Sequence, residues 1–228
     1  MANTTLQILF EDNHLIAINK AASQIVQGDK TGDTTLPDLI KGYLKEKYQK
    51  PGNVFCGVIH RLDRPTSGIV LFARTSKALE RMNAQFRDKE TNKTYWAILE
   101  KEPTEKKATL THYLKKNEKQ NKSYVVGEKE GGKLAKLHYE IIGKSEHYFL
   151  AEVQLETGRH HQIRAQFAAI GCRIKGDLKY GAKRANPDGS IALHARKLRF
   201  FHPTTKENIE LTAQVPNDPL WTYFEHLF

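Results

Sequence analysis

Residues 108–155 carry the pattern that most constrains the fold of this chain, because apolar and polar side chains alternate there in three successive runs. Leu110 and Leu114 belong to the first run, Leu137 to the second and Val153 to the third. Successive side chains of a strand point to opposite faces, so alternation is typical of antiparallel strands with one buried face. The pattern predicts antiparallel β-structure throughout this region.

Helical spacing of apolar residues appears in three other segments. We expect an amphipathic helix over residues 36–48, a second over 76–88 with Ser76 as its N-cap, and a third over 161–170 that ends at Gly171. Short strands are predicted for residues 6–10, 15–19, 94–99, 191–200 and 208–213. Without a convincing linker or repeat, the sequence predicts one α+β domain over residues 1–228, with a long, mostly antiparallel sheet.

Composition indicates a polyanionic partner. The 228 residues carry a formal net charge of +10, which favours nucleic acid, although general surface basicity is an alternative reading. Residues 1–5 lack the layout of a signal peptide, and no apolar run approaches the roughly 20 residues that span a bilayer. Two lone cysteines, Cys56 and Cys172, give neither a disulfide framework nor a zinc spacing. We therefore expect a cytoplasmic protein without a metal site.

A single carboxylate, Asp63, stands in a polar turn between two β-branched apolar runs in residues 58–72. The pattern predicts a strand, a tight loop and a second strand, with Pro65 stiffening the loop and Gly68 ending it. A rigid scaffold that presents one acid on a loop is a common form of active site. The alternative is that Asp63 only caps the turn or pairs with a neighbouring arginine, and for an isolated aspartate that alternative is the commoner.

Residues 60–68 (HRLDRPTSG) resemble the HRLD-x-x-[ST]-S-G motif of the RluA family of RNA pseudouridine synthases. Further similarities follow in the family's order: residues 93–97 resemble K-x-Y-x-A, residues 157–164 resemble T-G-R-[TS]-H-Q-[IL]-R, and residues 176–181 match G-D-x-x-Y-G. Three ordered motifs are a far more specific signal than any one of them.

The resemblance runs from about residue 8 to about residue 215, and it implies both fold and reaction. The implied fold is a mixed sheet with flanking helices and a central RNA-binding cleft, without the additional S4 domain that relatives often carry. The implied reaction breaks the N1–C1′ bond of a uridine in rRNA or tRNA, turns the flipped base and rejoins it through C5. It needs no cofactor and no metal. A monomer that acts on RNA, and on no membrane, is expected.

The resemblance also assigns roles to individual residues. Asp63 is the catalytic acid, which attacks the ribose or takes its C2′ proton. Arg164 is the cation that keeps this carboxylate ionised and oriented. Tyr95 stacks on the target uracil and helps remove the C5 proton. The residues expected to bind RNA are Arg61, Arg64, Arg159 and His160.

Each role has a plainer alternative. Tyr95 alone reads as a strand tyrosine with its ring in the core, and Arg164 alone reads as a surface helix arginine. Arg61 could fill the space left by the flipped base, since extruding a base costs about a few kcal/mol, or it could simply pair with Asp63 or with phosphate.

The sequence departs from the family pattern in two regions. Residues 20–23 read KAAS where K-P-[AS]-G is usual, so this loop is expected to lose stiffness. In the third motif His160 replaces Thr or Ser, and residues 165–166 replace a frequent Val-His. His160 can still donate a hydrogen bond, so activity is expected to survive.

Two other functional classes remain open at this point. An RNA-binding factor without catalysis would share the basic charge, but it has no need of a carboxylate that faces phosphates. A hydrolase with Asp63 as its nucleophile would need a second acid or base to activate water, and no such residue is visible.

Overall fold

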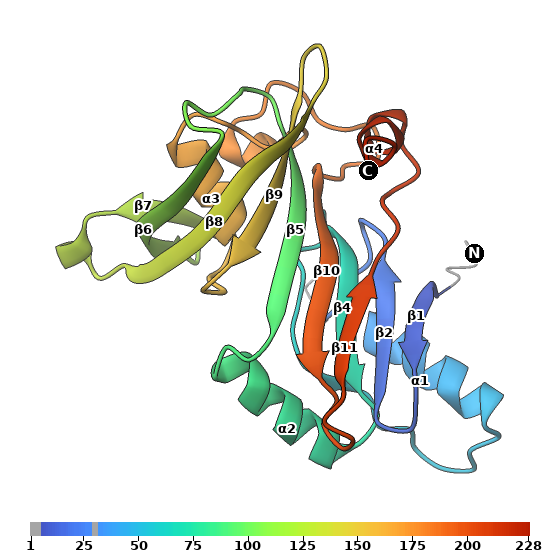
Figure 1. Cartoon of the computed structure of the whole chain (residues 1–228). Coiled ribbons are helices and arrows are strands. Elements are labelled where there is room, and N and C mark those ends of the chain that lie inside the picture. The colour runs from blue at the N-terminus through green and yellow to red at the C-terminus, as the bar shows by residue number, and fades with distance from the viewer. Residues whose placement is uncertain (1–5, 29–31) are drawn as a thin grey trace. The chain divides into compact units, whose positions relative to one another are not determined.

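The computed structural model describes residues 6–28 and 32–228 of the chain (Figure 1). Residues 1–5, for which the sequence predicts no signal peptide, lie outside this part. The chain divides into two compact units, of which unit 1 comprises Met1–Asn92 and Ala195–Gln214 and unit 2 comprises Lys93–His194 and Val215–Phe228. Each unit is built from two separate segments, and the expectation of one domain over residues 1–228 stays a prediction.

Unit 1 is built on the strands β1 (Ile8–Glu11), β2 (Leu15–Lys20), β4 (Ser67–Ala73) and β10 (Leu193–Phe201), which are neighbours in this order. The short β3 (Gly57–Val58) pairs with β4, and β11 (Asn208–Thr212) pairs with β10. The pairings β1–β2, β2–β4, β3–β4 and β10–β11 are all antiparallel.

Two helices cover opposite faces of this sheet, which explains why β2 and β4 are apolar at almost every position. Helix α1 (Leu36–Lys47) packs on the face that carries Ile16, Ile18, Val70 and Phe72. Helix α2 (Ser76–Arg87) packs on the face that carries Leu15, Ala17, Ile69 and Leu71. A strand buried on both faces has no polar side to alternate with.

Both of these helices were predicted, with one error at a cap. The predicted N-cap of α2, Ser76, is the first helical residue, and Thr75 caps the helix by accepting from the Ala78 backbone N–H at 3.1 Å. The two residues are both good caps, and only the backbone conformation distinguishes them.

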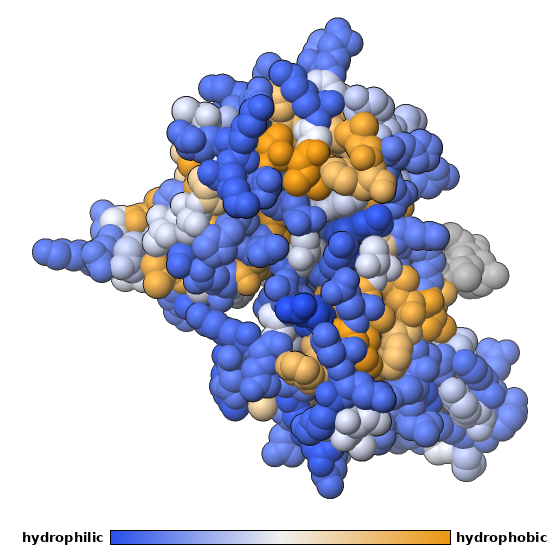
Figure 2. Space-filling view, viewed as in Figure 1, coloured by the Kyte–Doolittle hydropathy of each residue, from blue (hydrophilic) through white to orange (hydrophobic). Residues whose placement is uncertain are grey.

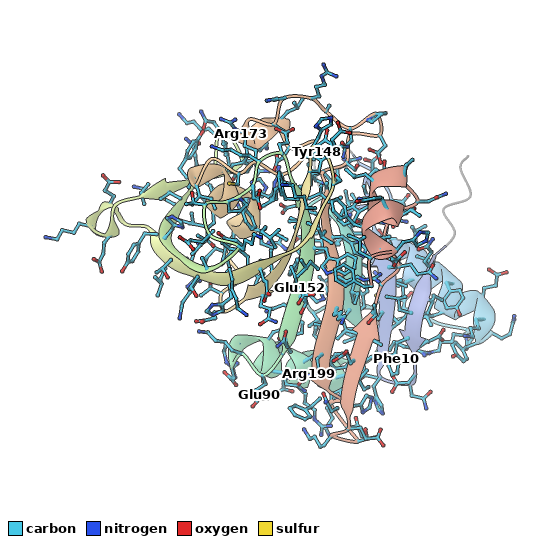
Figure 3. The ribbon with its side chains drawn as sticks, turned by 45° about the horizontal axis from the view of Figure 1, so that its top comes forward. Phe10, Glu90, Tyr148, Glu152, Arg173 and Arg199 are labelled. Carbon is cyan, nitrogen blue, oxygen red and sulfur yellow. The ribbon has the colours of Figure 1, made fainter. Side chains whose placement is uncertain are left out.

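Unit 2 confirms the alternation read from the sequence. Its strands β5 (Asn92–Leu99), β9 (Phe149–Leu155), β8 (Lys133–Lys144), β6 (Lys107–Asn117) and β7 (Lys122–Val126) follow one another in an antiparallel sheet. Leu110 pairs with Leu137, which pairs with Leu155. On the other face the Trp96 indole N–H donates to the Glu152 carboxylate on the paired strand at 3.3 Å. Glu152 is labelled in Figure 3.

Helix α3 (Gln162–Ala169) covers one face of this sheet, where Phe167 contacts Tyr139 with ring centroids 5.3 Å apart. Gly171 follows it in the left-handed conformation (φ 75°), as predicted. Two 3₁₀ turns, η1 (Glu128–Glu130) and η2 (Leu178–Tyr180), and the helix α4 (Pro219–Glu225) complete the unit. Asp218 caps α4 and Pro219 starts it, although the sequence predicted no helix there.

The α+β class and the mostly antiparallel sheet are therefore confirmed. Hydrophilic side chains cover most of the face shown in Figure 2. Within residues 6–28 and 32–228, no helix is both long and apolar enough to cross a bilayer. Over the same residues, no three His, Cys, Asp or Glu side chains are grouped so that they could hold a metal ion.

Candidate active-site residues

Asp63 lies on the loop that joins β3 to β4, as the sequence predicts, and its side chain is partly exposed. The Asp63 carbonyl accepts the Thr66 backbone N–H at 3.0 Å, which closes the turn. Upstream, His60 Nε2 accepts the Leu71 backbone N–H at 3.1 Å while its ring stacks on Phe86 with centroids 4.9 Å apart. The carboxylate therefore sits on a well-braced loop that solvent can reach.

Gly68 has a different role from the one expected. It lies inside β4, paired with Lys20, rather than at the end of the loop. Its φ is +111°, and a Cβ atom there would lie 2.4 Å from the Ala195 carbonyl oxygen. Only glycine fits this position, because the backbone of Ala195 occupies the space that any side chain would need.

Lys20, at the end of β2, anchors the Asp63 loop through hydrogen bonds, and the sequence did not predict this role. Its side chain is fully buried, and Nζ donates to the carbonyls of Ala21 (2.9 Å), Arg64 (3.1 Å) and Thr66 (2.6 Å). Burial lowers the pKa of Lys20 to about 7, although the charge of Asp63 favours the protonated form. The signal in the sequence was a lysine at the end of a largely apolar strand.

The loop that departs from the family pattern is closed by other means. Ser23 adopts a left-handed backbone conformation (φ 75°) at the position where glycine is usual, and its N–H donates to the Arg64 carbonyl at 3.0 Å. Ala21, at the usual proline position, has an N–H that donates to Gln24 Oε1 at 2.9 Å. These two hydrogen bonds hold the loop, and its expected loss of stiffness stays a prediction.

The two loop arginines each have a polar partner on the preceding segment. Arg61 Nη1 donates to Gln27 Oε1 at 2.5 Å, and Arg64 forms an ion pair with Asp33. The side chains of Arg64 and Asp33 are 42% and 49% exposed. An ion pair this exposed is worth only about 0–1 kcal/mol, so a phosphate can displace it.

In unit 2, Arg164 is not the surface arginine that its place in the sequence allows. It is 5% exposed on α3, and its Nε and Nη2 donate to the two carboxylate oxygens of Asp177 at 2.6 and 2.8 Å. The guanidinium carbon lies 5.1 Å from the centroid of the Tyr180 ring. Asp177 was not predicted as a partner, although it belongs to the G-D-x-x-Y-G segment. Asp63 belongs to unit 1, and its pairing with Arg164 stays a prediction.

Tyr180 organises the start of α3. Its hydroxyl donates to the Ser123 carbonyl (3.0 Å), accepts the Ser123 N–H (2.9 Å) and lies 3.0 Å from His161 Nδ1. Burial, and after it the charge of Arg164, lower the pKa of His161 to about 2, so the ring is neutral. His160 stacks on His161 and lies 2.9 Å from Ser123 Oγ, so the replacement of Thr or Ser by His160 retains a hydrogen bond.

The loop before α3 is fixed by the side chain of Gln162. Its Oε1 accepts Thr157 Oγ1–H (2.7 Å) and the Arg159 backbone N–H (3.0 Å), and its Nε2 donates to the Lys136 carbonyl (3.1 Å). The exposed Arg159 donates through Nε to the Leu134 carbonyl at 2.9 Å. Arg159 is therefore held at the end of the sheet with its guanidinium at the surface.

Tyr95 lies on β5 opposite Val153, which lies opposite Tyr139. Directly paired residues project from the same face, and Tyr139 contacts Phe167 of α3, so Tyr95 projects from the face that α3 covers. It is 9% exposed. Unit 2 therefore places Tyr95 and Arg164 on one side of its sheet.

Ser23→Gly should raise the free energy of unfolding by about 0.5 kcal/mol, because glycine adopts φ 75° without the steric cost that serine bears. Urea denaturation measures the change. Ala22→Gly is the control, since Ala22 has an ordinary φ and should be slightly destabilised by glycine. Equal losses in both variants would contradict the strain at Ser23.

Lys20→Met should remove a pH dependence of stability. With a pKa of about 7 in the folded chain and an ordinary, higher pKa in the unfolded chain, Lys20 binds more protons in the unfolded state above pH 7. The free energy of unfolding should therefore rise with pH above 7, by about 1 kcal/mol per pH unit.

Urea denaturation at pH 7, 8 and 9 tests this, with the exposed Lys45→Met as the control. The native protein and Lys45→Met should share the rise, and Lys20→Met should lose it. A rise of the same slope in all three proteins would show that Lys20 does not titrate in this range.

Comparison with known proteins identifies the family. The family model described as RNA pseudouridylate synthase matches residues 14–169. The ribosomal large subunit pseudouridine synthase D of Zymomonas mobilis is 32% identical over 223 residues, which cover 93% of this chain and 70% of that protein. The uncharacterized RNA pseudouridine synthase YhcT of Bacillus subtilis is 37% identical over 220 residues, with the same coverage.

Solved structures agree on the fold. The human RNA pseudouridylate synthase domain containing 4 superimposes with a TM-score of 0.78 at 22% identity, covering 96% of this chain and 91% of that chain. The human RNA pseudouridylate synthase domain containing 1 superimposes with a TM-score of 0.74 at 24% identity, covering 95% of this chain and 86% of that chain. With its three motifs in order and a family match over most of its length, the chain belongs to the RluA family of RNA pseudouridine synthases, enzymes that isomerise uridine to pseudouridine in RNA.

Proposed function

We propose that this synthase modifies uridine in the RNA of the large ribosomal subunit, and that Asp63 is its catalytic carboxylate. The observation that carries the second part is the loop itself: a partly exposed aspartate whose flanking carbonyls, Arg64 and Thr66, are tied to the buried Lys20 ammonium. The substrate follows from relatives such as the ribosomal large subunit pseudouridine synthases of Zymomonas mobilis and Rickettsia prowazekii, the latter 33% identical over 211 residues.

Asp63 either attacks C1′ of the ribose or takes the C2′ proton. Both roles require an ionised carboxylate in a fixed direction, and the braced loop supplies the direction. Arg164 supplies the positive charge in this proposal. Because Asp177 holds its guanidinium in a bidentate pair, Arg164 can present its remaining N–H groups without losing its orientation.

Tyr95 provides a flat ring for the flipped uracil and a hydroxyl close to C5. Arg61 fills the vacated position in the RNA, and Arg64, Arg159 and His160 contact phosphate or sugar. The exposed guanidinium groups of Arg61, Arg64 and Arg159 support this assignment, since their existing bonds to neutral groups or to one exposed carboxylate are easily exchanged.

We also propose that the protein works in the cytoplasm as a monomer. Cys56 and Cys172 are both free thiols, which suits a reducing compartment. Burial raises the pKa of the Cys56 thiol to about 12, so this thiol is protonated and unreactive. Sedimentation of the purified chain tests the monomer.

Asp63→Asn should reduce pseudouridine formation by at least about 1,000-fold, because an amide is neither a nucleophile nor a base. Pseudouridines are mapped in total RNA from cells with and without each variant, and RNA binding is measured in parallel. Binding should persist. Asp88→Asn, an exposed carboxylate on the end of α2, is the control and should retain full activity.

Normal turnover by Asp63→Asn would disprove the mechanism. Pseudouridines confined to transfer RNA would disprove the ribosomal substrate and leave the mechanism standing.

Tyr95→Phe should keep the stacking ring and lose the hydroxyl. Release of tritium from uridine labelled at C5 should therefore slow by roughly 100-fold, while RNA affinity stays unchanged. Tyr139→Phe is the control, because Tyr139 lies on the same face of the sheet. Within residues 6–28 and 32–228, the one hydrogen bond described for its hydroxyl goes to the Glu105 carbonyl. Equal rates for both variants would leave Tyr95 with stacking alone.

A further inference from the structure

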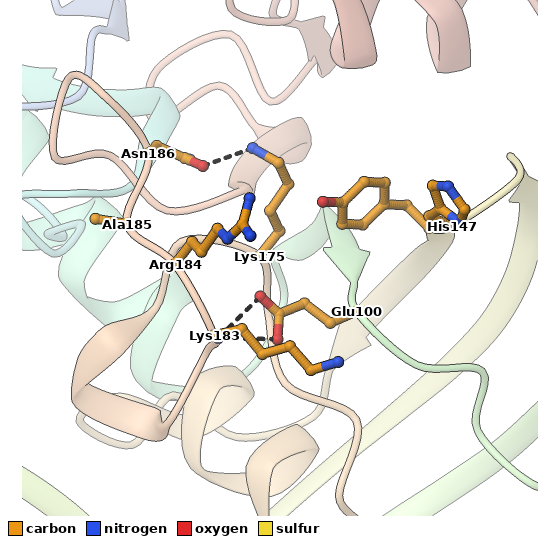
Figure 4. A pocket seen from close by; sticks show the side chains of 8 residues that line it. Glu100, His147, Lys175, Lys183, Arg184, Ala185 and Asn186 are labelled. Atoms are coloured by element: carbon orange, nitrogen blue, oxygen red, sulfur yellow. Dashed lines mark hydrogen bonds between the residues drawn. The ribbon is translucent and has the colours of Figure 1, made fainter.

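Unit 2 contains a cavity that includes no residue of the three motifs. It has a volume of about 570 Å³ and is lined by Glu100, His147, Tyr148, Lys175, Lys183, Arg184, Ala185 and Asn186 (Figure 4). Cavities of roughly 300–1,000 Å³ are of the size that holds a small ligand. The lining comes from the end of β5, the β8–β9 turn and the segments on either side of η2.

Positive charge dominates this cavity. Lys175, Lys183 and Arg184 line it, and over residues 6–28 and 32–228 the side chains of Lys183 and Arg184 have no ion-pair partner. The carboxylate in the wall, Glu100, already accepts the Lys183 backbone N–H with both oxygens at 3.2 Å. The charges of Lys183 and Arg184 are thus available to an anion from outside the chain.

The third cation is held in place. Lys175 Nζ donates to Asn186 Oδ1 at 2.6 Å, and its backbone bonds Ile98 and Ala192 at 2.9 Å each. The nearby carboxylate of Asp188 is bonded to Ser190 through its side chain and backbone. A cation fixed in this way can meet a ligand with little further loss of side-chain entropy.

Aromatic groups form another part of the lining. His147 and Tyr148 lie in the turn between β8 and β9, where the Tyr148 N–H donates to Ser145 Oγ at 3.1 Å and fixes the turn. A flat ring beside cations is the combination that proteins use for single-stranded nucleic acid, since the base stacks and the phosphate pairs. A bare phosphate would use only the cations.

We infer that this cavity is an accessory RNA-binding site that takes one unpaired nucleotide, with its phosphate on Lys183 and Arg184 and its base against Tyr148. The inference rests on RNA being the substrate of this family. The site would grip RNA away from the target uridine, and so it would affect affinity rather than the chemical step.

The test uses a fluorescent oligouridylate of about 12 nucleotides that carries one 4-thiouridine. Ultraviolet cross-linking to the whole chain should label His147 or Tyr148 in the tryptic peptide of residues 145–159. Fragmentation of the peptide locates the label, because the same peptide ends in residues 157–159 of the third motif. The double variant Lys183→Ala/Arg184→Ala should lose this cross-link and bind roughly 10-fold more weakly at 0.1 M salt, and its salt slope should fall by about 0.7, the value for one phosphate on a single strand. Tyr148→Leu should weaken binding roughly 10-fold without changing the slope.

Lys45→Ala/Lys50→Ala is the matched control, because it removes two exposed lysines and the same charge from unit 1. It should keep the cross-link. No label on His147 or Tyr148, or equal losses in the two double variants, would overturn the inference. Unchanged binding by Tyr148→Leu would also overturn it, because it would indicate a site for phosphate alone.

Pseudouridine formation is measured on the same preparations. A native chain that cross-links at His147 or Tyr148 but forms no pseudouridine would count against the proposed function and not against this site. A native chain that forms pseudouridine but shows no such cross-link would count against this site and not against the proposed function.

Discussion

A single buried ammonium group supports the loop that carries Asp63, the proposed catalytic carboxylate. Lys20 uses all three of its N–H groups on the carbonyls of Ala21, Arg64 and Thr66, which belong to the two loops beside Asp63. Burying a charged lysine is costly even when every donor is satisfied, as the lowered pKa of Lys20 shows. The chain bears this cost where two irregular loops need a common anchor, and the result is a carboxylate with a defined position.

Unit 2 also holds a buried cation with hydrogen bonds, but there the acceptor is a carboxylate and not a set of backbone carbonyls. There the buried charge is a guanidinium, Arg164, and its anchor is the carboxylate of Asp177. The neutral His161 and the Tyr180 hydroxyl complete the surroundings, so that one charged group is oriented by a second charge and by dipoles. In both units a polar side chain in the interior is satisfied by hydrogen bonds, which makes the candidate catalytic groups rigid before any RNA binds.

Departures from the family pattern show how local geometry can be kept by other residues. Ser23 adopts the left-handed conformation that glycine usually provides, and Gln24 bonds the N–H that a proline at Ala21 would lack. His160 reaches Ser123 where a shorter hydroxyl side chain is usual. In each case a residue other than the usual one supplies the local conformation or hydrogen bond.

The sequence alone determined the class of fold, the sheet of unit 2, three of the helices and the family, because periodicity and ordered motifs are local properties of a chain. It did not reveal that Lys20 anchors the Asp63 loop, that Asp177 orients Arg164, or that Gly68 is required by the backbone of Ala195. In these contacts Lys20 and Thr66 are 46 positions apart in the sequence, Arg164 and Asp177 are 13 apart, and Gly68 and Ala195 are 127 apart. Only tertiary structure brings such residues together, since burial and backbone contact depend on how the strands and helices pack, and neither spacing nor composition encodes that packing directly.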